Sequence, residues 1–80
     1  MSVRIVFLGP LRDVAGAPEL CVAGPLDWQG LLEAVGPAVA DQLGDAQVHV
    51  ACAGTVLADR TALCAEDGEE VALLPPVSGG

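Results

Sequence analysis

The sequence predicts an α+β fold in which one main helix packs across one face of a mixed sheet of about five strands. Three observations predict this class: short β-branched runs with alternating polarity, one amphipathic stretch with helical spacing, and glycine-proline breaks between them. The chain has 80 residues, fewer than the usual domain of about 100–150 residues. No linker or repeat divides it, so we expect a single domain over residues 1–80.

The first two strands are expected over residues 3–8 and 19–23. Alternation in the first run places its core face on Val3, Ile5 and Phe7, and Gly9-Pro10 ends it. Residues 12–16 are polar and then small, which predicts a connecting loop and an antiparallel pair of strands.

The main helix is expected over residues 28–35. Asp27 stands at the N-cap position, where a carboxylate accepts hydrogen bonds from free backbone N–H groups. Leu31, Leu32 and Val35 form the apolar stripe, followed by Val39. Gly36-Pro37 interrupts the helix, because proline lacks the N–H group, so a second short turn is expected over 37–43.

The second half predicts three more strands. Residues 47–53 alternate, a Gly54-Thr55 turn leads to a short strand around Val56-Leu57, and residues 70–74 form the last strand. Residues 59–67 read as a loop with one helical turn near Ala62. Strand, strand, helix, strand, short strand, strand is the order of the β-grasp, or ubiquitin-like, fold, in which the terminal strands lie side by side at the centre.

The charge and hydropathy exclude several classes of function. Eleven acids and three arginines, without lysine, give a net charge of −8. That charge excludes autonomous binding to nucleic acid or an anionic membrane, and 52% apolar residues exclude disorder. The N-terminus lacks a signal-peptide pattern, and no apolar run approaches the roughly 18 residues of a membrane span. We therefore expect a cytoplasmic protein.

No catalytic or metal-binding constellation is visible in the side chains. His49 is the sole histidine, and the cysteines at 21, 52 and 64 are odd in number and lack a C-x-x-C spacing. We expect no metal site and three buried thiols in a reducing compartment. The acidic turn over residues 66–70 is either a solvated loop or a surface that attracts a basic partner.

The C-terminal end of the sequence is unusual. An apolar strand runs into Pro75-Pro76 and then into Val77-Ser78-Gly79-Gly80. The prolines stiffen the exit, residues 77–80 are expected to be a flexible tail, and two glycines leave a slender backbone that can enter a narrow channel.

The end of the chain resembles the MoaD-type sulfur carriers, the small subunits of molybdopterin synthase in the MoaD/ThiS ubiquitin-like family. The resemblance is strongest over Asp67 to Gly80, which is close to the family's acidic turn, apolar strand and P-P-V-x-G-G tail. A second match covers residues 4–8 and 11–16.

The resemblance implies a reaction at the terminal carboxylate of Gly80, with Gly79 keeping the tail slender. In this family an adenylyltransferase of the ubiquitin-activating (MoeB) type uses ATP to form an acyl-adenylate on that carboxylate. Sulfur from a donor protein replaces AMP, and the thiocarboxylate then attacks cyclic pyranopterin monophosphate in the large (MoaE-type) synthase subunit. The resemblance implies no cofactor bound to the carrier itself and no catalytic side chain of its own.

Docking to these partners is expected to use exposed apolar side chains with a polar rim. The candidates are Leu8, Val56 and Leu74, followed by the tail residues Pro75, Pro76, Val77 and Ser78. The alternative for the first three is that they fill the core.

Three other functions stay open. The chain could carry sulfur for thiamine, cysteine or tRNA thiolation, since those carriers also end in Gly-Gly. It could be a ubiquitin-like modifier of other proteins, although without lysine it cannot build lysine-linked chains on itself. It could also be a plain interaction domain whose tail is incidental.

Overall fold

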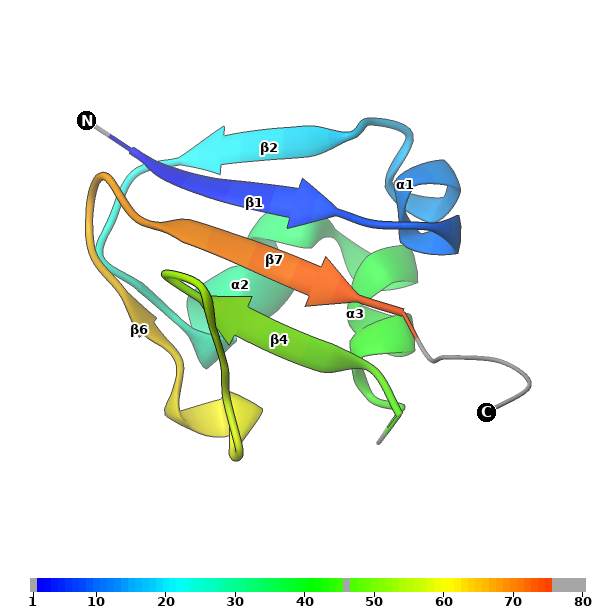
Figure 1. Cartoon of the computed structure of the whole chain (residues 1–80). Helices are drawn as coiled ribbons and strands as arrows, with labels where there is room; N and C mark the ends of the chain where they lie inside the picture. Colours follow the sequence, from blue (N-terminus) through cyan, green and yellow to red (C-terminus); the bar gives the residue numbers. More distant parts are fainter. Residues whose placement is uncertain (1, 46, 76–80) are drawn as a thin grey trace.

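The computed structural model describes residues 2–45 and 47–75, and Figure 1 shows their arrangement. The strands are β1 (Val3–Phe7), β2 (Glu19–Val22), β3 (Leu26–Asp27), β4 (His49–Cys52), β5 (Thr55–Val56), β6 (Cys64–Ala65) and β7 (Glu70–Leu74). The helices are α1 (Pro10–Ala15), α2 (Trp28–Val35), α3 (Pro37–Leu43) and the 3-10 turn η1 (Arg60–Ala62).

The main sheet has the order β2-β1-β7-β4-β5, and its two central strands come from opposite ends of the chain. β1 and β7 are parallel, with Ile5 opposite Val71 and Phe7 opposite Leu73. β2 and β4 flank them in antiparallel orientation. This topology confirms the predicted β-grasp fold, including the adjacent terminal strands.

Helices α2 and α3 cover one face of this sheet, behind it in the view of Figure 1. α2 begins where the sequence predicts, because the Asp27 carboxylate accepts a 2.7 Å hydrogen bond from the Gly30 N–H. It ends at Gly36, whose φ of +87° is a conformation that glycine tolerates. Pro37 then starts α3, so the expected second turn is a helix of seven residues.

The hydrophobic core lies between the sheet and these helices. Alternate residues of the strands face it, so β1 contributes Val3, Ile5 and Phe7 and β7 contributes Val71 and Leu73, all at most 2% exposed. The helices contribute Leu11, Leu31, Val39 and Leu43. The core face predicted for the first strand is therefore confirmed.

Three elements, α1, β3 and β6, were not predicted. The loop expected over residues 12–16 is largely α1, which Pro10 starts and Gly16 ends with a φ of +77°. α1 has only six residues and no side-chain N-cap, so Leu11, Val14 and Ala15 form too short a pattern to identify a helix by periodicity. The loop expected over 59–67 contains η1, as predicted near Ala62, and also β6, which pairs with β3 in a separate two-stranded sheet.

Arg60 joins η1 to the connection between α3 and β4. Its guanidinium donates hydrogen bonds to the carbonyl oxygens of Asp45 (2.6 Å) and Val48 (2.9 Å). It also lies 5.7 Å from the centre of the Trp28 ring, a cation–π distance. One arginine thus links α2, η1 and the start of β4.

The helices of the described ranges are short. None of them has both the length and the apolar character needed to cross a bilayer.

Candidate functional site

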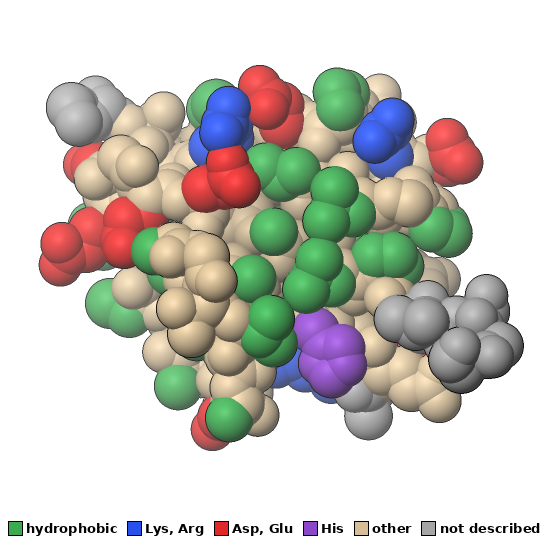
Figure 2. All heavy atoms as spheres, viewed as in Figure 1, with side chains coloured by type: hydrophobic (Ala, Val, Ile, Leu, Met, Phe, Trp, Pro, Cys, Tyr) green, Lys and Arg blue, Asp and Glu red, His purple; other side chains and the backbone are tan. Residues whose placement is uncertain are grey.

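The candidate site is the sheet face that the helices leave uncovered. Register brings side chains from four strands together there: Val6 and Ala51 both lie opposite Ala72, and Val56 lies opposite Ala51. Figure 2 shows hydrophobic side chains gathered across the middle of this face. We call this set the apolar patch, and it consists of Val6, Leu8, Ala51, Val56, Ala72 and Leu74.

The predicted docking residues belong to this patch and not to the core. Leu8 directly follows β1 and its N–H donates to the Leu73 carbonyl at 3.3 Å, so the alternation of the strand continues through it. Leu8 and Leu74 are half-buried, whereas Val56 is 54% exposed. None of the three belongs to the buried core or packs against it. The alternative that they fill the core is therefore wrong.

Sequence reasoning missed half of the patch. Val6, Ala51 and Ala72 complete it, and the alternation within residues 3–8 and 70–74 is the signal that could have found two of them. His49 lies at its border, because it pairs with Leu74 and is exposed. Small alanines at the centre leave the surface flat enough for larger partner side chains to approach.

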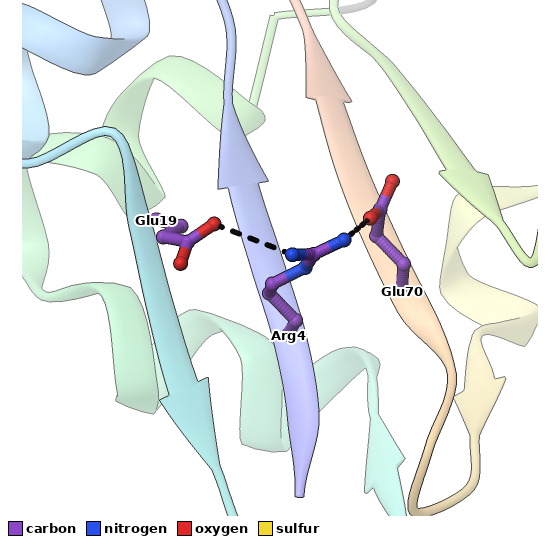
Figure 3. A network of polar contacts seen from close by, with 3 residues as sticks. All are labelled: Arg4, Glu19 and Glu70. Carbon is purple, nitrogen blue, oxygen red and sulfur yellow. Dashed lines mark hydrogen bonds and ion pairs between the residues drawn. The ribbon is translucent and has the colours of Figure 1, made fainter.

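An ion-pair network borders the patch at the start of β1 and β7 (Figure 3). Arg4 lies between Glu19 of β2, 3.7 Å away, and Glu70 of β7, to which its guanidinium donates a hydrogen bond. That bond and the charges of Glu70 and Glu19 raise the pKa of Arg4. The side chains stay about half exposed, so the network adds little stability, but it supplies the polar rim expected of a docking surface.

The acidic turn over residues 66–70 has an internal structure. The Asp67 carboxylate accepts from the Gly24 N–H at 2.7 Å, and the Glu69 carboxylate accepts from the Glu66 N–H at 2.7 Å. A Cβ at Gly24 would lie 2.7 Å from the same Asp67 oxygen, so this contact requires glycine. These carboxylates hold the turn in place before β7, and contact with a basic partner stays a prediction.

The predicted reactive segment begins next to the patch. Leu74 is the last residue of β7 and a patch member, and Pro75, which is half-buried, follows it directly. Pro76, Val77, Ser78, Gly79 and Gly80, together with the flexible tail predicted for 77–80, lie outside the described residues. The chain therefore reaches its predicted reactive segment from the edge of the predicted docking surface.

The side chains offer little other chemistry. In the ranges 2–45 and 47–75, no three His, Cys, Asp or Glu side chains are grouped so that they could hold a metal ion. The expectation of three buried thiols is wrong, since Cys21 and Cys64 are exposed and Cys52 is half-buried. Partial burial is the main cause that raises the pKa of Cys52, which makes it a poorer nucleophile near neutral pH.

Comparison with known families and structures agrees with this geometry. The model of the ThiS family matches residues 5–80. A comparison with curated protein sequences finds no significant match.

Several solved structures share the fold. The crystal structure of small archaeal modifier protein 1 from Haloferax volcanii has 28% identity and a TM-score of 0.71, with 100% of each chain covered. The solution structure of the same-named protein from Methanosarcina acetivorans has 22% identity and a TM-score of 0.72, covering 99% of this chain and 96% of that one. A complex of subunits 1 and 2 of molybdopterin-converting factor from Helicobacter pylori contains a chain with 24% identity and a TM-score of 0.68, again with full coverage of both.

Proposed function

The chain belongs to the ThiS family, and from that premise we propose that it is the sulfur carrier subunit of a molybdopterin synthase. The observation that carries the proposal is the position of the apolar patch, which reaches Leu74 immediately before the Pro-Pro-Val-Ser-Gly-Gly end. A partner that covers the patch also holds the segment that must enter its active site. The Pro-Pro-Val-x-Gly-Gly form of the end favours the molybdopterin pathway over other sulfur pathways.

The first reaction we propose activates the terminal carboxylate of Gly80. A carboxylate is a poor electrophile, so an adenylyltransferase transfers AMP from ATP to it and releases pyrophosphate. The mixed anhydride now has a good leaving group. Sulfur at the oxidation level of sulfide, delivered by a donor protein, attacks the carbonyl carbon, AMP departs, and a thiocarboxylate remains. In this scheme the activating enzyme uses ATP, and the carrier binds no cofactor of its own.

The second reaction transfers the sulfur. The patch docks on the large synthase subunit, the tail enters its active site, and the thiocarboxylate attacks cyclic pyranopterin monophosphate. The attack leaves a thioester between Gly80 and the pterin. Water then cleaves the bond between the Gly80 carbonyl carbon and the sulfur, so the sulfur stays on the pterin, the carboxylate returns and the carrier is used again. The carrier contributes a reactive terminus and a docking face, while the large subunit contributes the catalytic groups. A dithiolene contains two sulfurs, so two carriers that bear a thiocarboxylate are used for each product molecule.

Intact mass spectrometry tests the first reaction directly. The chain is incubated with ATP, a MoeB-type adenylyltransferase and a sulfur donor, and we expect a mass gain that corresponds to replacement of one oxygen by sulfur. The matched control lacks Gly79 and Gly80 and retains every residue that the structure describes, so it should fold normally and gain no mass. A shortened chain that gains the same mass contradicts the proposal.

A second candidate is a ubiquitin-like protein modifier. The likeness to the Haloferax volcanii modifier favours it, because its identity of 28% extends over the whole length of both chains. The two functions separate after activation. A modifier forms isopeptide bonds with lysine side chains of other proteins, whereas a synthase subunit yields the dithiolene when its thiocarboxylate form meets the large subunit and cyclic pyranopterin monophosphate. Isopeptide-linked adducts without dithiolene formation would favour the modifier. A thiocarboxylate form of the chain that yields neither product would favour another sulfur pathway.

A further inference from the structure

The centre of the apolar patch is lower than its border. Ala51 of β4 and Ala72 of β7 lie directly opposite each other in an antiparallel pair, so their Cβ atoms are neighbours on the open face. Val6 lies opposite Ala72 on the far side, and Val56 lies opposite Ala51. In this row across the sheet, two alanines therefore stand between two valines. We call the space above the two alanines the alanine socket.

Larger side chains also enclose the alanine socket along β7. Leu74 follows Ala72 by two residues on the same face, and His49 lies opposite Leu74. At the other end, Glu70 precedes Ala72 by two residues and forms the ion pair with Arg4. Ala72 itself is half-buried, so the floor of the socket stays accessible. The floor is thus bordered by larger side chains across the sheet and at both ends of the β7 row.

A partner that docks on the apolar patch must fill this socket. The core of a specific interface is packed as densely as a protein interior, and atoms that line a void lose their dispersion contacts. Each alanine lacks the two methyl groups of valine, so relative to its row the floor lacks a volume of about four methyl groups, close to one leucine or methionine side chain. A flat partner surface would leave that volume empty. One large apolar side chain would fill it at the centre of the patch, where the residues that contribute most to binding usually lie.

The charges around the patch indicate what surrounds that side chain. The chain carries 11 acids and three arginines, and the patch adjoins the acidic turn over residues 66–70 at Glu70. Figure 2 shows acidic side chains gathered at the left of the same face. Arg4 is already paired with Glu19 and Glu70. Lysine or arginine on the partner's rim is therefore complementary to this face, whereas an acidic rim would be repelled.

We propose that Ala51 and Ala72 form a socket for one large apolar side chain, about the size of leucine or methionine, which the large synthase subunit presents within a ring of basic residues. This inference rests on the proposed function and names the chemistry of its docking partner. The two alanines are then specificity-determining residues, because the partner recognises their small size and not only their apolar character. Every group of the socket belongs to the sheet, so this contact does not depend on where the tail lies.

Enlarging the floor tests the socket, because the expected change in Kd has the opposite sign from that of simple hydrophobicity. Ala72→Val and Ala51→Val add apolar methyl groups to the patch, and each should raise Kd for the large subunit about tenfold in calorimetric titration. If apolar area alone attracted the partner, Kd would fall instead. Valine has a higher strand propensity than alanine, so the Tm of both variants should stay the same or rise, which separates a docking defect from a folding defect. Ala38→Val is the matched control, since it adds the same groups to an exposed site on α3 and should leave Kd within twofold.

A double-mutant cycle identifies the partner's side chain. Each exposed leucine, methionine or phenylalanine of the large subunit is replaced by alanine, and Kd is measured with the unchanged chain and with Ala72→Val. Truncation of the side chain that fills the socket should weaken docking of the unchanged chain and leave room for the new valine. The two changes together should therefore raise Kd by less than the product of their separate effects.

Several results would overturn the proposal. Ala72→Val and Ala51→Val that leave Kd unchanged or lower it, or a cycle in which every truncation acts independently of Ala72→Val, would exclude the socket while the proposed function stands. Rising salt should raise Kd of the unchanged chain, and a Kd that does not rise would exclude the basic ring. If the unchanged chain binds no large synthase subunit, the proposed function itself fails, and the socket fails with it.

Discussion

Replacement of Val56 by alanine isolates the contribution of the apolar patch to docking. Val56 is 54% exposed and lies on β5, one of the two edge strands of the main sheet. The change removes two methyl groups, each worth about 0.8 kcal/mol when fully buried. About half of their surface is still available for burial by a partner. The docking free energy should therefore weaken by about 0.9 kcal/mol, which raises Kd about fourfold.

The assay is calorimetric titration of the chain, with its terminal carboxylate unmodified, into the large subunit of a molybdopterin synthase. Val14 supplies the matched control, because it is 41% exposed but lies on α1 and outside the patch. Val14→Ala should leave Kd within twofold. Val56→Asp places a carboxylate where docking excludes water, so it should raise Kd by more than about a hundredfold. Val56→Ala and Val14→Ala with equal Kd values, or Val56→Asp that binds normally, would refute the assignment of the patch.

Two further predictions concern stability. Arg60→Ala removes the hydrogen bonds to the carbonyls of Asp45 and Val48 and the contact with Trp28. The free energy of unfolding, measured by urea denaturation, should therefore fall by about 2–3 kcal/mol. A loss no larger than that of Arg12→Ala would contradict this. The hydrogen bonds from the Thr61 hydroxyl and N–H lower the pKa of Asp59 in the folded chain from 3.8. The ionised Asp59 carboxylate therefore stabilises the fold fully above pH 3.8, and this stabilisation is lost as the pH falls through the lower folded-state pKa. The Tm advantage of the unchanged chain over Asp59→Asn should therefore shrink as the pH is lowered below 3.8, and a Tm difference that does not change with pH would contradict the assignment.

The elements that sequence reasoning located are those with a strong local signal. β7 has the predicted bounds of 70–74, and α2 has the predicted bounds of 28–35, because the Asp27 cap and the Gly36-Pro37 break mark both helix ends chemically. α1 was missed because a helix of six residues without a side-chain N-cap is too short for its apolar spacing to be distinctive. β3 and β6 were missed because strands of two residues are too short to show alternation.

The candidate site also has one part that the local sequence predicts and another that depends on the order of the strands. The proposed reactive end, Gly79-Gly80, could be predicted from the sequence because the proposed chemistry depends only on consecutive residues. Leu8, Val56 and Leu74 were proposed as exposed docking residues from strand alternation and the family resemblance, and the structure places all three on the open face. Ala51 and His49 were not assigned to that face, since nothing local shows that β4 lies beside β7.

The sequence by itself determined the alternation of each strand, the ends of the main helix, the acidic charge and the glycine end, since these depend on neighbours in the chain. The tertiary structure alone decided which outward side chains share one surface. Strand order and register bring Val6 opposite Ala72 although 66 residues separate them, and the same packing rests the Pro75 ring against Gly9. Such contacts result from how the whole core closes between sheet and helices. No short window of the sequence carries that information.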